Sequence, residues 1–189
     1  MPSPSYQPFY CEENIWQLCQ DPRLGASERL VGLITGPNGP QRSSRCAFWH
    51  QRLADSRGEA VLWDFHVVLF VRSAGWQVWD LDSDLGMPVA ADAYLSATFG
   101  DQMTVATHLQ PRIRLVGGEA YVAGLCSDRS HMRDGHGLFL QPPPPWPAPG
   151  GGRENNLARY LDPTDPALGV VVTLDGLRAR LALPPSAVS

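Results

Sequence analysis

Lysine is absent from this 189-residue sequence, and arginine supplies all 15 of its basic residues. A Walker lysine, a Schiff-base lysine and a Ser-Lys dyad are therefore excluded. The sequence also lacks any run of about 18 apolar residues, so no membrane span is expected. With a net charge of −4 and no basic patch, it offers no surface for nucleic acid. Its first ten residues lack the basic and apolar parts of a signal peptide, so we expect a cytoplasmic protein, also nuclear if the source is eukaryotic.

Cysteine is scarce, and its spacing argues against both disulfides and metal binding. The four cysteines form no C-x-x-C pair, and disulfides are not expected in a reducing compartment. Most of them should behave as small buried apolar residues. The five histidines show no ligand spacing with a cysteine, so the sequence predicts no metal and no other cofactor.

The length suits one domain with a full core, whereas two domains would be cramped. We therefore expect a single catalytic domain over residues 1–189, with residues 1–9 as a loose lead-in. Residues 141–152 read QPPPPWPAPGGG. Because proline lacks an N–H donor and fixes φ, this stretch is predicted to be a loop.

The strand signal is clearest over residues 61–72, VLWDFHVVLFVR. Its odd positions are apolar, while its even positions include Asp64, His66 and Arg72, which predicts one core face and one polar face. A turn at Ser73–Gly75 leads into a partner strand at 76–82, giving a hairpin.

Other segments alternate between helix and strand signals. The loop at 35–45 separates an N-terminal helix from the strands, and no internal repeat is visible. We predict helices at 11–21, 90–99, 118–125 and 174–181, and strands at 45–53, 113–116 and 169–173. This order predicts an α+β fold with an antiparallel sheet and helices packed on it.

Cys11 stands at the start of the first predicted helix. Unpaired N–H groups and the helix dipole favour a thiolate there. The adjacent acids Glu12 and Glu13 oppose it, so a protonated histidine would have to stabilise the thiolate. The alternative is a buried structural cysteine.

The predicted hairpin brings a histidine and a carboxylate together. If Ser73–Gly75 is a three-residue loop, Asp82 lies opposite His66 and Asp80 is its diagonal neighbour on the same face. A two-residue loop would turn Asp80 to the other face. With Cys11 packed against this sheet, the arrangement would be a Cys-His-Asp triad.

At these residues the sequence resembles the protein N-terminal glutamine amidohydrolase family. The matching segments are YCEEN (10–14), WDFHV (63–67), WDLD (79–82), SDRSHM (127–132) and PPPP (142–145). The family motif is W-D-Y-H-V, and Phe65 replaces its tyrosine, which removes a hydroxyl on the predicted core face. The matches extend from residue 10 to about 181. The order Cys, His, Asp with the cysteine at a helix start is similar to papain-like and transglutaminase-like enzymes, which implies a core of that kind.

The resemblance implies a triad of Cys11, His66 and Asp80 that deamidates the N-terminal glutamine of proteins or peptides without a cofactor. It selects Asp80 over Asp82, and two arguments agree. A diagonal side chain can lean across to the ring edge, and Asp82 begins DSDLG, where the strand should end. We expect a monomer whose product, N-terminal glutamate, leads into an N-degron route.

Recognition of a chain terminus requires a partner for the α-ammonium, because an unpaired buried ammonium is very costly. Asp64 is favoured because it shares the predicted face of His66. The acids that could serve are Glu12, Glu13, Asp64, Asp82 and Asp128. The family match adds rim candidates, so the proposed substrate-binding set is Tyr10, Glu12, Glu13, Trp63, Asp64, Ser127 and Asp128. Any one of these acids could instead be a solvated or capping group.

Two other functions fit parts of the sequence. The same triad could belong to a papain-like peptidase or an acyltransferase. The PPPPWP run could instead bind an aromatic-lined groove and make this an adaptor, although a rigid surface loop explains it more simply. Ammonia release from a Gln-initiated peptide would distinguish the amidohydrolase from these two alternatives.

Overall fold

A computed structural model describes residues 4–25, 27–40, 44–56, 58–100 and 105–183. The first three residues of the predicted lead-in and residues 41–43 of the predicted loop at 35–45 lie outside the described residues. No helix within these ranges combines the length and apolar character needed to cross a bilayer.

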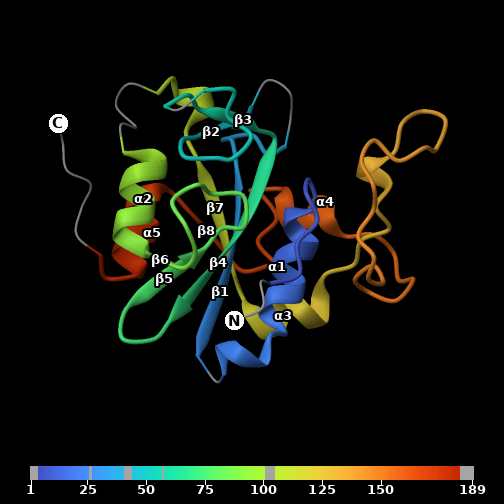
Figure 1. The fold of residues 1–189 in the computed structure, drawn as a ribbon, viewed down its shortest axis with the longest axis horizontal. Coiled ribbons are helices and arrows are strands. Elements are labelled where there is room, and N and C mark those ends of the chain that lie inside the picture. Colours follow the sequence, from blue (N-terminus) through green and yellow to red (C-terminus); the bar gives the residue numbers. More distant parts are fainter. Residues whose placement is uncertain (1–3, 26, 41–43, 57, 101–104, 184–189) are drawn as a thin grey trace.

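A six-stranded antiparallel sheet forms the centre of the molecule (Figure 1). Its order is β6-β5-β4-β1-β7-β8, and every neighbouring pair is antiparallel. The strands are β1 (Glu28–Thr35), β4 (Phe65–Arg72), β5 (Trp76–Trp79), β6 (Val89–Ala90), β7 (Arg112–Gly117) and β8 (Val170–Val172). The predicted α+β class with an antiparallel sheet is confirmed.

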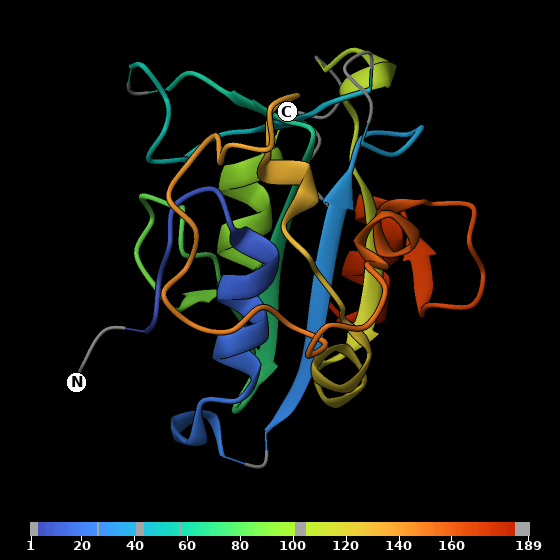
Figure 2. The ribbon, with the colours of Figure 1, turned by 90° about the vertical axis from the view of Figure 1, so that its right-hand side faces the viewer.

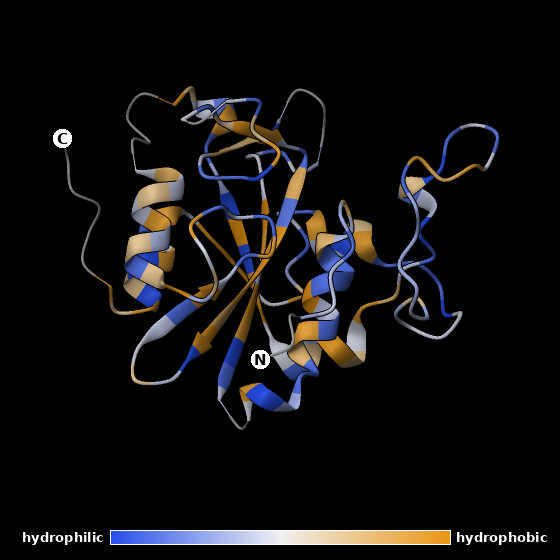
Figure 3. Cartoon of the chain, in the orientation of Figure 1, coloured by the Kyte–Doolittle hydropathy of each residue, from blue (hydrophilic) through white to orange (hydrophobic). Residues whose placement is uncertain are grey.

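Helices cover both faces of this sheet, which separates two apolar clusters. One face carries α1 (Cys11–Cys19), α3 (Gly118–Gly124) and α4 (Leu157–Leu161), and Figure 2 shows α1 lying in front of the sheet. The other face carries α2 (Ala91–Phe99) and α5 (Leu174–Arg180). Figure 3 shows the apolar residues of the strands gathered between these helix layers. Three short 3-10 helices complete the helical segments of the described residues, at Pro22–Leu24, Thr107–Leu109 and Ser130–Met132.

The strand β1 was not predicted, although it lies in the middle of the sheet between β4 and β7. Its apolar run LVGLI shows no alternation, because both of its faces are covered. Gly32 interrupts the run, and a Cβ there would lie 2.8 Å from Cε2 of Phe70. The glycine that weakens the sequence signal for a strand is thus what allows the Phe70 ring to pack on β1.

The prediction of a single strand over 61–72 with one polar face is wrong. The chain breaks at Asp64, so β3 (Val61–Trp63) pairs with β2 (Cys46–Phe48) in a separate two-stranded sheet, and only β4 joins the main sheet. The even-numbered Val68 and Phe70 are fully buried, packed in the cluster beneath α2 and α5. Period-2 polarity failed here because helices cover both faces of β4.

The predicted hairpin register is confirmed. Arg72 pairs with Trp76 across Ser73–Gly75, and the ladder continues to Leu69 opposite Trp79. There the strand ends. The backbone N–H of Asp82 turns back to donate to the Asp80 carboxylate at 3.0 Å, so Asp82 does not take the ladder position opposite His66.

Candidate active site

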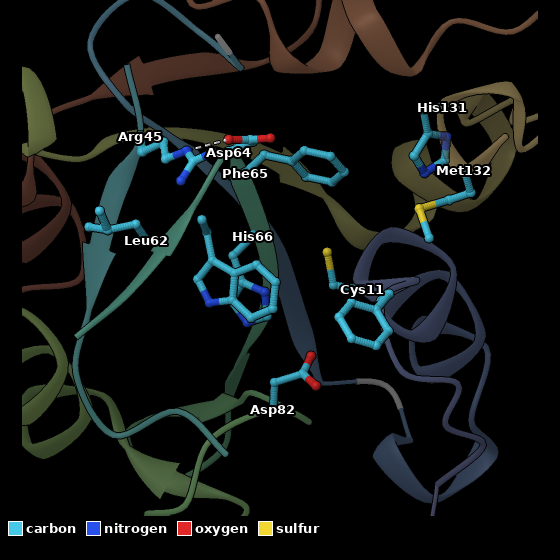
Figure 4. A pocket seen from close by; sticks show the side chains of 11 residues that line it. Cys11, Arg45, Leu62, Asp64, Phe65, His66, Asp82, His131 and Met132 are labelled. Carbon is cyan, nitrogen blue, oxygen red and sulfur yellow. Dashed lines mark hydrogen bonds and ion pairs between the residues drawn. The ribbon is translucent and has the colours of Figure 1, made fainter. Parts of the chain in front are cut away.

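Cys11 is the first residue of α1, and its side chain borders a cavity of about 250 Å³ (Figure 4). The preceding Phe9 has a left-handed backbone (φ 69°) that turns the chain into the helix. Tyr10 is buried, and its hydroxyl donates to the carbonyl of Gln141 at 3.1 Å. The Phe9 backbone and the Tyr10 hydrogen bond therefore fix the position of the start of α1. Cys11 is 9% exposed, which makes it the most accessible of the four cysteines.

His66 and Asp80 form a buried pair at the start of β4 and the end of β5. The ring nitrogen Nε2 lies 2.8 Å from Oδ1 of Asp80, and both side chains are 1% exposed. Because an ionised carboxylate only accepts hydrogen bonds, Nε2 carries the proton. In the neutral ring the other nitrogen, Nδ1, is then the base. It has no hydrogen-bond partner among the described residues.

Two aromatic side chains fix the plane of the His66 ring. Trp63 stacks on it with centroids 5.3 Å apart and an interplanar angle of 13°. Phe48 meets it edge-on, also at 5.3 Å. The imidazole can therefore turn little, and Cys11 and His66 point into the same cavity from α1 and β4 (Figure 4).

Two residues that the sequence did not suggest hold the Asp80 carboxylate. Its Oδ2 accepts from Gln51 Nε2 at 3.0 Å and from the Tyr94 hydroxyl at 2.8 Å. The Gln51 carbonyl in turn accepts from the Trp63 indole N–H at 3.2 Å. Gln51 and Tyr94 come from an irregular segment and from α2, and no local motif marks either of them.

The pKa values of this group follow from burial and mutual charge. Burial would raise the pKa of Asp80, but His66, Gln51 and Tyr94 outweigh it and lower the value. Burial would lower the pKa of His66, but Asp80 and Cys11 raise it well above its ordinary range. Burial raises the pKa of Cys11 to about 11, with His66 opposing the rise. A charged imidazolium beside the sulfur is thus the group that favours thiolate formation.

A metal ion could in principle be held by His66, Asp80 and Asp82, whose nearest ligand atoms lie within 4.8 Å of one another. However, both oxygens of Asp80 already accept hydrogen bonds from protein donors. The donor set therefore fits a carboxylate that orients an imidazole better than a metal ligand.

The proposed substrate-binding residues divide into two groups. Trp63 and Asp64 border the cavity, whereas Tyr10, Glu12, Glu13, Ser127 and Asp128 do not. The full lining is Phe9, Cys11, Arg45, Leu62, Trp63, Asp64, Phe65, His66, Asp82, His131 and Met132. Asp64 lies on the rim, paired with Arg45 at 3.0 Å. Six lining residues were not proposed for the site from the sequence: Phe9, Arg45, Leu62, Phe65, His131 and Met132.

Several residues outside the cavity have structural partners instead. Glu13 is fully buried and receives two hydrogen bonds of 2.7 Å from Arg129 and one of 3.0 Å from the Trp146 indole. Ser127 accepts from the backbone of Arg129, and Asp128 from the backbone of Ser130. The contacts of Glu13 attach the segment around the proline run to α1, whereas those of Ser127 and Asp128 stabilise a local turn.

The fold and the cavity therefore present a cysteine at a helix start, an oriented histidine and a buried carboxylate. This is the arrangement of enzymes that transfer acyl groups through a cysteine.

Comparison with known proteins identifies the family to which this chain belongs. The family model of N-terminal glutamine amidase matches residues 6–181, so the chain belongs to this family. It is 32% identical to the protein N-terminal glutamine amidohydrolase of Homo sapiens over 167 residues, covering 87% of this chain and 80% of the human protein. The Caenorhabditis elegans protein of the same name is 32% identical over 159 residues, 82% of this chain and 83% of its own.

Proposed function

We propose that this protein deamidates the N-terminal glutamine of proteins and peptides, giving N-terminal glutamate and ammonia. The observation that carries the proposal is the cavity that contains both Cys11 and the Asp80-bound His66, in a chain of the N-terminal glutamine amidase family. It also supports the reading of the fold as a papain- or transglutaminase-like core with its nucleophile at a helix N-terminus.

The first half of the reaction forms a thioester. His66 Nδ1 takes the Cys11 thiol proton, and the sulfur attacks the side-chain carbonyl carbon of the substrate glutamine. The C–N bond breaks, and His66 gives its proton to the leaving nitrogen, which departs as ammonia. N–H groups at the start of α1 would stabilise the oxyanion.

The second half regenerates the enzyme. His66 removes a proton from a water molecule, which attacks the thioester carbonyl. The C–S bond breaks, the sulfur recovers the proton from His66, and the product is a γ-carboxylic acid that ionises by releasing its proton to water. Throughout, Asp80 keeps the proton of the neutral ring on Nε2 and stabilises the imidazolium.

A direct test uses a Gln-initiated peptide, with ammonia measured enzymatically and the product examined by mass spectrometry. We expect ammonia and a Glu-initiated peptide of unchanged length. Shorter fragments would instead identify a peptidase. If neither ammonia nor fragments formed, the adaptor hypothesis would remain.

We further propose that the whole chain acts as one catalytic domain and as a monomer in the cytoplasm. The family match supports a single domain because it spans residues 6–181 without a break into two units. Size-exclusion chromatography with light scattering tests the oligomeric state, and fractionation of the source cells tests the location.

A further inference from the structure

We propose that Asp82 binds the α-ammonium group of the substrate and thereby restricts the reaction to the chain terminus. This inference rests on the function proposed above. An N-terminal amine has a pKa of about 7.7 to 8.0, so much of it is charged near neutral pH. Placing that cation in a cavity requires a compensating group, since an unpaired buried charge is strongly unfavourable.

Asp82 is buried, and one of its two carboxylate oxygens can still accept a hydrogen bond from a ligand. Its residue is 4% exposed, yet its side chain lines the cavity together with Cys11 and His66 (Figure 4). A single side chain donates to it among the described residues, the Tyr6 hydroxyl, at 2.5 Å from Oδ1. The second oxygen, Oδ2, accepts from no described donor. No arginine or histidine of the described residues forms an ion pair with Asp82, and the His66 ring within 4.8 Å of it is paired with Asp80.

Two other acids near the site already have an arginine partner. Glu13 has both oxygens on Arg129 at 2.7 Å. Asp64 is half exposed and paired with Arg45.

Glu12 is the strongest competitor, because it is fully buried and adjacent to Cys11. It lies outside the lining of the cavity, however, and its carboxylate is 3.2 Å from His131 Nε2. Its other oxygen is 3.9 Å from the Cys11 sulfur.

The position of Asp82 also suits the length of a glutamine side chain. The amide carbon of glutamine is four bonds from the α-nitrogen, a reach of about 5 Å when extended. One carboxylate oxygen of Asp82 lies within 4.8 Å of a ring nitrogen of His66, and Asp82 borders the same cavity as Cys11 and His66. A glutamine whose ammonium contacts Asp82 can therefore place its side-chain carbonyl beside Cys11.

Tyr6 is the positioning residue for this contact. It belongs to residues 4–9, which are held to α1 by a pair of 2.8 Å hydrogen bonds between the Gln7 backbone and the Asn14 amide. Its hydroxyl fixes Oδ1 of Asp82, which leaves Oδ2 for the substrate.

The test compares two peptides that differ only in the terminal amine. One begins with glutamine, and the other begins with the same residue lacking its α-amino group. For the wild type, removing the amine should lower kcat/KM by roughly a hundredfold or more, as for loss of one partner of a buried charge pair. Asp82→Asn should lower kcat/KM for the Gln peptide by a similar factor and leave the deamino peptide nearly unchanged. The matched control is Asp84→Asn, an exposed carboxylate two residues away that should change neither value.

Three outcomes would overturn the inference. Asp82→Asn could lower both peptides equally, which would indicate a structural role. It could leave the preference for the amine intact, or Glu12→Gln could abolish that preference instead. Calorimetric binding of the Gln peptide to Cys11→Ala, with and without Asp82→Asn, keeps the test valid if turnover is too slow. A wild type that releases no ammonia from the Gln peptide would refute the proposed function, which is a separate result.

Discussion

Replacing Asp80 with asparagine separates the charge of this side chain from its shape. In the wild type, Oδ1 accepts from His66 and from the Asp82 backbone, at 2.8 and 3.0 Å. Oδ2 accepts from Gln51 and Tyr94, at 3.0 and 2.8 Å. An asparagine must place its NH2 group against one of these two sets, and each contains an N–H donor. One buried contact therefore becomes a donor-donor conflict whichever way the amide is turned.

The expected loss has two parts. Without the Asp80 charge, the imidazolium that forms when His66 takes the thiol proton loses its main stabilising partner. The same change in a Ser-His-Asp enzyme costs about 10⁴-fold, so we expect kcat to fall by roughly 10³- to 10⁴-fold. This corresponds to about 4 to 5.5 kcal/mol in activation free energy. The donor conflict should lower the free energy of unfolding by about 1 to 3 kcal/mol.

The assay is kcat for ammonia release at saturating Gln peptide, with urea unfolding followed by circular dichroism under the same conditions. Tyr94→Phe serves as the companion variant, because it removes one donor to Asp80 and keeps the charge. Its kcat should fall by roughly 10- to 100-fold, the worth of one hydrogen bond to a charged group, and so by clearly less than that of Asp80→Asn. If folded Asp80→Asn keeps kcat within about tenfold of the wild type, the orienting role assigned to Asp80 is wrong.

Three further predictions concern the nucleophile, the substrate and the fold. Cys11→Ala should release no ammonia while keeping its urea midpoint, and normal turnover by this variant would refute the mechanism. In the wild type, Cys11 should be alkylated faster than the other cysteines. The alkylation rate should increase as the pH rises toward the Cys11 pKa of about 11. N-terminal asparagine holds its carbonyl about 1.5 Å nearer the backbone and should react roughly a hundredfold more slowly in a parallel ammonia assay, so equal rates would contradict the geometry. Arg129→Met should lower the free energy of unfolding by about 3 to 5 kcal/mol, since Glu13 stays buried and unpaired. The control Arg72→Met breaks only an exposed pair with Glu28 and should cost under about 1 kcal/mol in the same urea titration.

The sequence predicted the parts of the site that depend on local order. The turn at Ser73–Gly75 determined the hairpin register, and the register placed Asp80 near His66. The partner strand was predicted over 76–82 with its end at Asp82, but β5 already ends at Trp79, and Asp80 rather than Asp82 meets the ring.

What escaped prediction depends on packing between distant segments. The strand β1 is buried on both faces, so it shows no alternation, and β4 lost its expected polar face for the same reason. Gln51 lies 29 positions before its partner Asp80, and Tyr6 lies 76 positions before its partner Asp82. Side chains of these types are common in proteins, and nothing next to them in the sequence marks a carboxylate partner.

The ion pair between Glu13 and Arg129 determines when the site can form during synthesis of the chain. The helix that carries Cys11 leaves the ribosome before the partners of its buried Glu13, because Arg129 lies 116 residues later and Trp146 lies 133 residues later. Until that segment has emerged, α1 carries an uncompensated carboxylate that cannot be buried against the sheet. The nascent chain thus carries its reactive cysteine before it can assemble a working site, which needs the segment around Arg129 and Trp146. Prematurely terminated products that stop before this segment would carry the thiol without the enzyme activity.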